Sequence, residues 1–156
     1  GDGITELPRA VLMAGYKDTS SSDAVYMLDW YAYGIGKVPT KVATTYQNIS
    51  DAWSLLIDQK WHDRITAIKV SDGGLSYVEF FEYRKNKMSI PLFNIYCATG
   101  SNREYYAERT DLIQLGQTTQ AIYFAKLTNE GEQSELALTG DEIKARFSLV
   151  NQAWNN

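Results

Sequence analysis

The 156-residue chain has the length of one domain, and 44% hydrophobic with 13% aromatic residues exclude a disordered chain. Its net charge is −4, and the only dense cluster of positive charge is Arg84, Lys85 and Lys87, which argues against nucleic-acid binding. One cysteine excludes an internal disulfide, and no apolar run reaches the roughly 18 residues of a membrane-spanning helix.

The N-terminal half of the sequence contains patterns typical of helices, of loops and of strands. Pro8 is expected in the first turn of a short helix, and residues 17–23 are expected to form a serine-rich loop. Residues 24–33 are almost all apolar, so periodicity leaves a helix and a buried strand both open. Apolar residues then recur at steps of four and three, at Val42, Tyr46, Ile49, Trp53 and Leu56. This spacing predicts a helix from Ser50 to about Gln59.

The segment 64–97 predicts a three-stranded antiparallel meander. Ser71-Asp72-Gly73-Gly74 and Arg84-Lys85-Asn86-Lys87 separate three β-rich runs, and an Asp-Gly pair is a strong hairpin signal. Both faces of the meander would be apolar, whereas an antiparallel sheet with one face in water shows one polar face. We therefore expect the meander to be covered on both sides, by helices, by its own curvature or by a partner chain. Pro91 predicts an edge strand or a bulge.

The C-terminal part predicts a further hairpin and two helices. Residues 112–127 form the expected hairpin, and Ser101 with Glu104 has the spacing of a capping box. Thr139 and Glu142 form a second such box, followed by an apolar stripe of Ile143, Phe147, Val150 and Trp154. The C-terminal helix is expected to cover one face of the meander, with Phe147 and Trp154 as its main anchors. The fold class expected for residues 1–156 is a single α+β domain: an antiparallel sheet (meander 64–97 plus hairpin 112–127) covered by helices.

The order of features from Trp61 onward resembles a domain of uncharacterised exported lipoproteins of Gram-positive bacteria. The features are Trp61 before the first strand, an aromatic hairpin, the strand 91–96, and Leu115-Gly116 leading into Ile122-Tyr123-Phe124-Ala125. This resemblance implies the cell envelope and no known activity. Since the chain begins Gly1-Asp2-Gly3 without a methionine, we expect a leader upstream of Asp2 that ends in a lipidated cysteine, the chain's only membrane anchor. A trimmed disordered start is the alternative.

No catalytic, metal or cofactor site is expected. His62 is the only histidine, and one His with Cys97 does not make a zinc site, which needs three or four ligands. Glu79 and Glu82 fall on opposite faces of one strand, which works against a glycosidase pair. Gly34-Ile35-Gly36 lacks the third glycine of a dinucleotide loop and is interpreted as a turn.

The chain has more aromatic residues than one core needs, so some are expected at the surface. The candidate ligand-binding residues are Trp30, Tyr31, Tyr33, Glu79, Tyr105 and Tyr106. Aromatic side chains stack on sugars or anchor protein interfaces. We therefore expect a non-catalytic binding module that contacts an envelope protein or a cell-wall ligand. The alternatives are a hydrolase using carboxylates and tyrosines on glycans or peptides, and a spacer domain without a ligand. The sequence leaves the ligand and the oligomeric state open.

Overall fold

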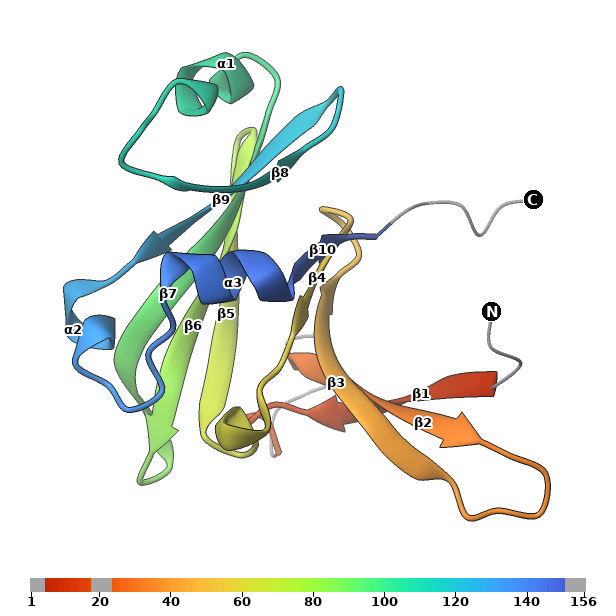
Figure 1. The fold of residues 1–156 in the computed structure, drawn as a ribbon. Coiled ribbons are helices and arrows are strands. Elements are labelled where there is room, and N and C mark those ends of the chain that lie inside the picture. The colour runs from red at the N-terminus through yellow and green to blue at the C-terminus, as the bar shows by residue number, and fades with distance from the viewer. Residues whose placement is uncertain (1–4, 18–23, 151–156) are drawn as a thin grey trace.

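The computed structural model describes residues 5–17 and 24–150, which form two five-stranded antiparallel sheets (Figure 1). Sheet A has the order β1(Thr5–Leu12), β2(Tyr26–Tyr33), β3(Thr40–Asn48), β4(Trp53–Leu56), β10(Phe147–Leu149). Sheet B has the order β5(Ile65–Asp72), β6(Leu75–Arg84), β7(Lys87–Thr99), β9(Ala121–Leu127), β8(Ile113–Gln117). The described helices are short: η1(Gln59–Trp61), α1(Asn102–Ala107), α2(Asn129–Glu132) and α3(Gly140–Arg146).

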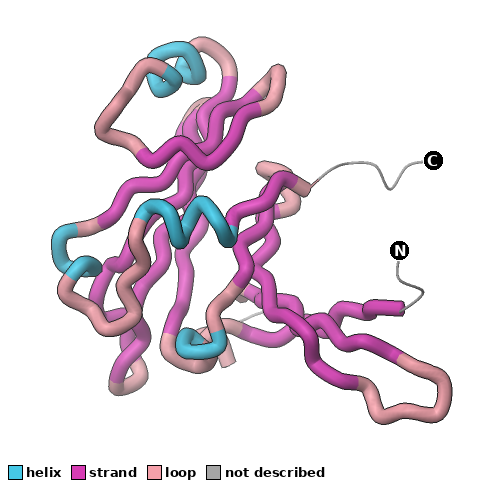
Figure 2. Tube along the Cα trace, in the orientation of Figure 1, coloured by secondary structure: helices cyan, strands magenta, loops and turns pink. Residues whose placement is uncertain are grey.

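The expected α+β fold is wrong, because strands dominate the chain and helices do not cover the sheet (Figure 2). The inner face of sheet B is buried in a core that it shares with sheet A. Sheet B contributes Ile65, Ala67, Val78, Phe80, Phe93, Ile95 and Cys97, and sheet A contributes Met27, Tyr46, Trp53 and Leu55. Sheet A, instead of helices, therefore covers the inner face of sheet B.

The predicted meander and the hairpin 112–127 are confirmed. Gly73 and Gly74 have φ of 35° and 85°, and Lys85 and Asn86 have φ of 50° and 60°. Positive φ at both central residues is what a two-residue type I′ turn requires. Pro91 lies in the central strand β7, ahead of the stretch from Phe93 to Thr99 that pairs with β9. At Pro91 the pairing with β6 shifts register, because Phe80 faces Phe93 while Phe81 faces Pro91. The bulge expected from Pro91 is present, and the edge-strand alternative is wrong.

The outer face of sheet B carries a row of stacked aromatic rings. The ring of Phe124 lies 4.8 Å from that of Tyr96 and 4.9 Å from that of Tyr106 in α1, and Tyr77 lies 5.1 Å from Tyr96. Each ring thus covers a face of its neighbour. This stacking, together with α1, shields part of the second apolar face from water.

The helix expected at Pro8 is wrong, since residues 5–12 form the edge strand β1. The backbone N–H of Met13 donates to the carbonyl of Val25 at 2.9 Å, so the odd residues of this antiparallel pair bond to β2. Pro8, which lacks an N–H, falls on the free edge, where proline costs no ladder bond and discourages edge-to-edge pairing. Within residues 24–33, for which the sequence allowed either a helix or a buried strand, residues 26–33 form strand β2.

The helix expected from Ser50 to Gln59 is also wrong. The chain turns after Asn48, whose side-chain Oδ1 accepts from the Ser50 hydroxyl at 2.8 Å and the Asp51 N–H at 3.3 Å, and then returns as β4. Asn48 and Trp53 are paired across this β3–β4 hairpin. The apolar spacing had suggested one helical stripe, but Tyr46 and Trp53 are buried on two strands while Ile49 is 73% exposed.

The C-terminal helix is shorter than expected, and its docking site is different. The capping box of Thr139 and Glu142 is confirmed, but α3 ends at Arg146, and its main contacts are with β8, β9 and β4. Phe147 is extended (ψ 139°) and begins β10, where its ring contacts those of Trp53 and Tyr123 at 5.9 and 5.7 Å. Trp154 lies outside the described residues. The box expected at Ser101 makes no side-chain cap bond, although α1 is present.

Strands β1 and β2, the loop 34–39 and residues 40–44 of β3 project away from sheet B and are named here the arm (Figure 1). Eight of the ten exposed large hydrophobic side chains in the described residues belong to sheet A or its loops: Leu7, Tyr26, Tyr33, Ile35, Val38, Val42, Ile49 and Leu56. Within the same residues, no helix has the length and hydrophobicity needed to cross a bilayer.

Candidate functional site

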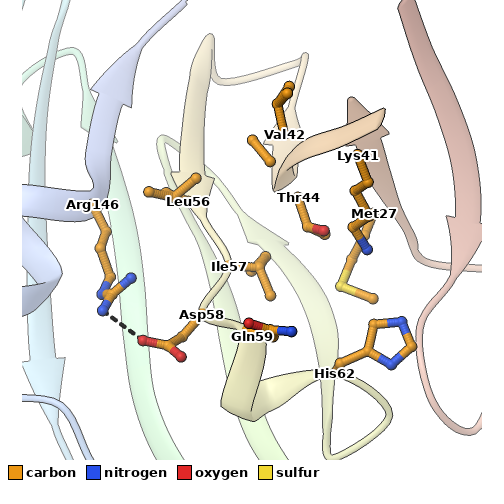
Figure 3. A pocket seen from close by; sticks show the side chains of 11 residues that line it. Met27, Lys41, Val42, Thr44, Leu56, Ile57, Asp58, Gln59, His62 and Arg146 are labelled. Carbon is orange, nitrogen blue, oxygen red and sulfur yellow. Dashed lines mark hydrogen bonds and ion pairs between the residues drawn. The ribbon is translucent and has the colours of Figure 1, made fainter. Parts of the chain in front are cut away.

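A groove of about 750 Å³ lies where the arm meets η1 and the end of α3 (Figure 3). Its apolar lining comes from Met27, Val42, Ala43, Leu56 and Ile57, and its polar lining from Lys41, Thr44, Asp58, Gln59, His62 and Arg146. An apolar concavity with a few convergent polar groups is the usual form of a ligand site. These residues come from β2, β3, β4, η1 and α3, so only the folded chain brings them together.

One end of the groove is held by an ion pair between α3 and the N-cap of η1. Asp58 Oδ1 accepts from the N–H of Lys60 at 2.9 Å, which places the carboxylate at the start of the helix. Its Oδ2 accepts from Arg146 Nη2 at 2.7 Å (Figure 3). Because Arg146 is in the last turn of α3, this pair connects the C-terminal helix to the groove. Gln59 and the exposed His62 follow on η1 and its C-cap.

The other end is held by Asp29, a buried carboxylate beside the groove. Asp29 Oδ1 accepts from the hydroxyl of Thr44 at 2.6 Å and lies 2.7 Å from Lys41 Nζ. Burial raises the pKa of Asp29, but the hydrogen bonds from Lys41 and Thr44 outweigh it and hold the pKa below its ordinary value. Asp29 is therefore ionised at neutral pH and cannot donate a proton there.

The charges of the groove are balanced in pairs. Lys41 is neutralised by Asp29, and Arg146 by Asp58. His62 Nδ1 lies 3.1 Å from Asp63. An anionic or cationic ligand would have to compete with these pairs, whereas an uncharged ligand would find donors and acceptors at both ends. The electrostatics of the groove thus favour an uncharged, hydrogen-bonding ligand.

Two of the candidate residues share the face of the groove. Tyr31 lies directly opposite Lys41, and side chains alternate along β2, so Tyr31 and Tyr33 lie on the same side as Met27 and Asp29. Among the described residues neither ring is stacked on another aromatic ring. Trp30 lies on the opposite face of the arm, where its Nε1 donates to Thr45 Oγ1 at 2.9 Å. The structure therefore places Tyr31 and Tyr33 on the groove side of the arm, outside the groove lining itself, and Trp30 on the other side.

The other three candidates lie on the outer side of sheet B. Glu79 is half-buried on β6, opposite Ile68 and Asn94, while Glu82 points to the buried inner side. Tyr106 stacks on Phe124, and the 62% exposed Tyr105 meets it edge-on at 5.0 Å. Arg109 lies over the ring of Tyr105, 5.9 Å from its centre. Glu79, Tyr105 and Tyr106 therefore do not form one site with the groove. The ring of Tyr106 packs on Phe124 and Tyr105, and the ring of Tyr105 also contacts Arg109.

The sequence did not point to five polar residues that line the groove, Lys41, Thr44, Asp58, Gln59 and Arg146, or to Asp29 beside it. An Asp before a helical turn is a local signal for an N-cap, and it could have placed Asp58. No local pattern could have connected Asp58 to Arg146, because their contact depends on how α3 packs between the two sheets. Lys41 and Asp29 could have been connected only once β2 and β3 were recognised as paired strands.

Within the described part of the chain, no three His, Cys, Asp or Glu side chains converge as a metal site would require. The resemblance to exported lipoprotein domains stays a prediction. The chain matches no protein-family model, no curated protein and no solved structure.

Proposed function

We propose that the chain is a non-catalytic binding module of the cell envelope, which holds an uncharged, extended glycan in the groove and along the face of Tyr31 and Tyr33. The observation that carries the proposal is that the groove and two tyrosine rings lie on one face of the arm. The groove combines apolar side chains with paired charges, and Tyr31 and Tyr33 have no aromatic neighbours among the described residues.

The chemistry of a sugar chain fits each part of this surface. Sugar rings have apolar C–H faces that pack on aromatic rings, and Tyr31 and Tyr33 keep such ring faces available. The row of Tyr77, Tyr96 and Phe124 on sheet B does not, since those rings are stacked on one another. The hydroxyl groups of a sugar both donate and accept hydrogen bonds. In the groove, Lys41 and Arg146 can donate, Asp58 can accept, and Thr44 and Gln59 can do both.

The carboxylates of the described chain support binding over glycoside hydrolysis. A glycosidase needs two carboxyl groups flanking one bond, one of them a general acid with a raised pKa. The pKa of Asp29 is instead lowered, and Glu79 and Glu82 lie on opposite faces of β6. Asp58 is bonded to Arg146, an arrangement that suits a fixed hydrogen-bonding position better than proton transfer.

The proposal is tested by titrating soluble neutral oligosaccharides and by sedimenting the protein with purified peptidoglycan sacculi. Tyr31→Ala and Gln59→Ala should each weaken binding at least about fivefold, the loss typical of an energetically important contact residue. Tyr105→Ala is the matched control, because this tyrosine is exposed on α1, away from the groove. Equal binding by Tyr31→Ala and Tyr105→Ala would disprove the groove as the site. Release of shortened sugars during the titration would show hydrolysis instead.

The location at the cell envelope rests on the resemblance and has its own test. Fractionation of cells that express the complete native gene should find the protein with the membrane and wall fractions. Recovery in the cytoplasm would contradict the location and leave the groove experiment unaffected.

A further inference from the structure

We propose that the tip of the arm, the loop between β2 and β3, inserts into the surface of an anionic lipid bilayer. The loop has the sequence Gly34-Ile35-Gly36-Lys37-Val38-Pro39. Ile35 is 105% exposed and Val38 is 86% exposed, the two highest values among the large hydrophobic side chains of the described residues. This contact goes beyond glycan binding and beyond any lipid anchor.

The local geometry presents Ile35 outward. The N–H of Lys37 donates to the carbonyl of Gly34 at 3.1 Å, which closes a four-residue turn with Ile35 and Gly36 at its centre. Gly36 has φ of 71°, and a Cβ placed on it would meet nothing within 4 Å. The turn is thus compact and surrounded by open space, and it belongs to the loop that closes the projecting β2–β3 hairpin (Figure 1).

The shape of the tip suits a bilayer better than a protein surface. A stable protein interface buries about 800 Å² on each partner, which requires a broad surface. The loop instead offers two aliphatic side chains on a convex apex. A fluid bilayer can enclose a convex tip on all sides, and it covers apolar side chains at its interface while Lys37 extends toward the headgroups.

The charge of the arm favours anionic lipid. The arm carries Arg9, Lys37 and Lys41 against Glu6 and Asp29, and Asp29 is paired with Lys41. The arm is therefore net positive, whereas the whole chain has a charge of −4. This asymmetry would orient the molecule with its tip toward a negative surface and the acidic remainder away from it.

The test is flotation of the purified protein with vesicles of phosphatidylglycerol and phosphatidylcholine in equal parts, and with phosphatidylcholine alone. Wild type should float with the anionic vesicles, less with the neutral ones, and less at high salt. Ile35→Ser combined with Val38→Ser should lower the bound fraction about tenfold or more, since each aliphatic side chain loses its burial. Ile49→Ser combined with Met88→Ser is the matched control, because both side chains are exposed elsewhere.

Three results would overturn the proposal. One is a wild type that floats with neither kind of vesicle, and another is equal flotation of the tip and control variants. The third is self-association of the wild type in sedimentation velocity without vesicles that the tip variant abolishes, which would identify the tip as a protein interface. Oligosaccharide titration of the tip variant separates the two proposals, because Ile35 and Val38 do not line the groove.

Discussion

Glu82 is a charged residue buried in the core, and its buried hydrogen-bond partner is Ser134. Glu82 is fully buried, its Oε2 accepts from the Ser134 hydroxyl at 2.7 Å, and Arg84 and Arg64 approach Oε1 from the surface. Ser134→Ala should lower the free energy of unfolding by about 1.5–3 kcal/mol, because a buried carboxylate loses a donor. Ser148→Ala, at an exposed position of β10, should change it by less than about 0.5 kcal/mol. Urea unfolding of both variants measures the difference.

The lowered pKa of Glu82 leads to a prediction of how the stability of the protein depends on pH. Burial raises the pKa of Glu82, but hydrogen bonds from Ser134 and Arg84 and the charges of Arg84 and Arg64 bring this pKa below its ordinary value. A folded-state pKa below the unfolded one contributes stability above the unfolded pKa, and this contribution is lost as pH falls through the folded pKa. The urea concentration at the unfolding midpoint should therefore decrease when the pH is lowered below about 4.5. Glu82→Gln should be less stable at neutral pH and should show a smaller drop. Parallel pH profiles would contradict this role.

At the scale of elements, β10 connects the C-terminal segment to the core through one ring. Phe147 is 8% exposed, pairs with Leu55 of β4 and contacts Trp53 and Tyr123. Phe147→Ala should destabilise the protein by about 3–5 kcal/mol, because the lost transfer energy adds to that of the remaining cavity. Lys144→Ala, exposed on α3, should have little effect. Denaturant unfolding gives both values. If Phe147→Ala changed the free energy of unfolding by less than about 1 kcal/mol, β10 would not be part of the core.

At the scale of the whole molecule, the two sheets share one main core. Tyr46 of β3 meets Phe80 of β6 at 5.5 Å, and Phe80 stacks on Phe93 at 4.9 Å. The Tyr123 hydroxyl of sheet B donates to the Asp51 carbonyl, between β3 and β4, at 2.8 Å. Because neither sheet can bury its apolar face alone, unfolding should be a single cooperative transition. Far-ultraviolet circular dichroism and tryptophan fluorescence should give coincident curves. Two separated transitions would show that the sheets fold independently.

Features that depend on neighbouring residues could be predicted from the sequence. The turns at Gly73-Gly74 and Lys85-Asn86, the meander and the capping box of Thr139 were predictable, since their signals are local. The sequence also placed Tyr31 and Tyr33 among the candidate residues, although it grouped them with Trp30, which faces the other way. That separation follows from strand alternation, which could not be applied while residues 24–33 were equally compatible with a helix.

Long-range packing, in contrast, is what makes residues 5–12 and 53–56 strands and what makes Phe147 begin β10 after α3 ends. Pro8 suits both a helix start and the free edge of a strand, and only the pairing with β2 selects the edge. Trp53 and Leu56 fit a helical period, but Trp53 is buried because its ring packs with Tyr46 and Phe147 in the core that both sheets share. The groove has the same origin. Met27, Asp58 and Arg146 meet only after long-range strand pairing and the packing of α3, because the energy that joins them comes from burying distant apolar surfaces.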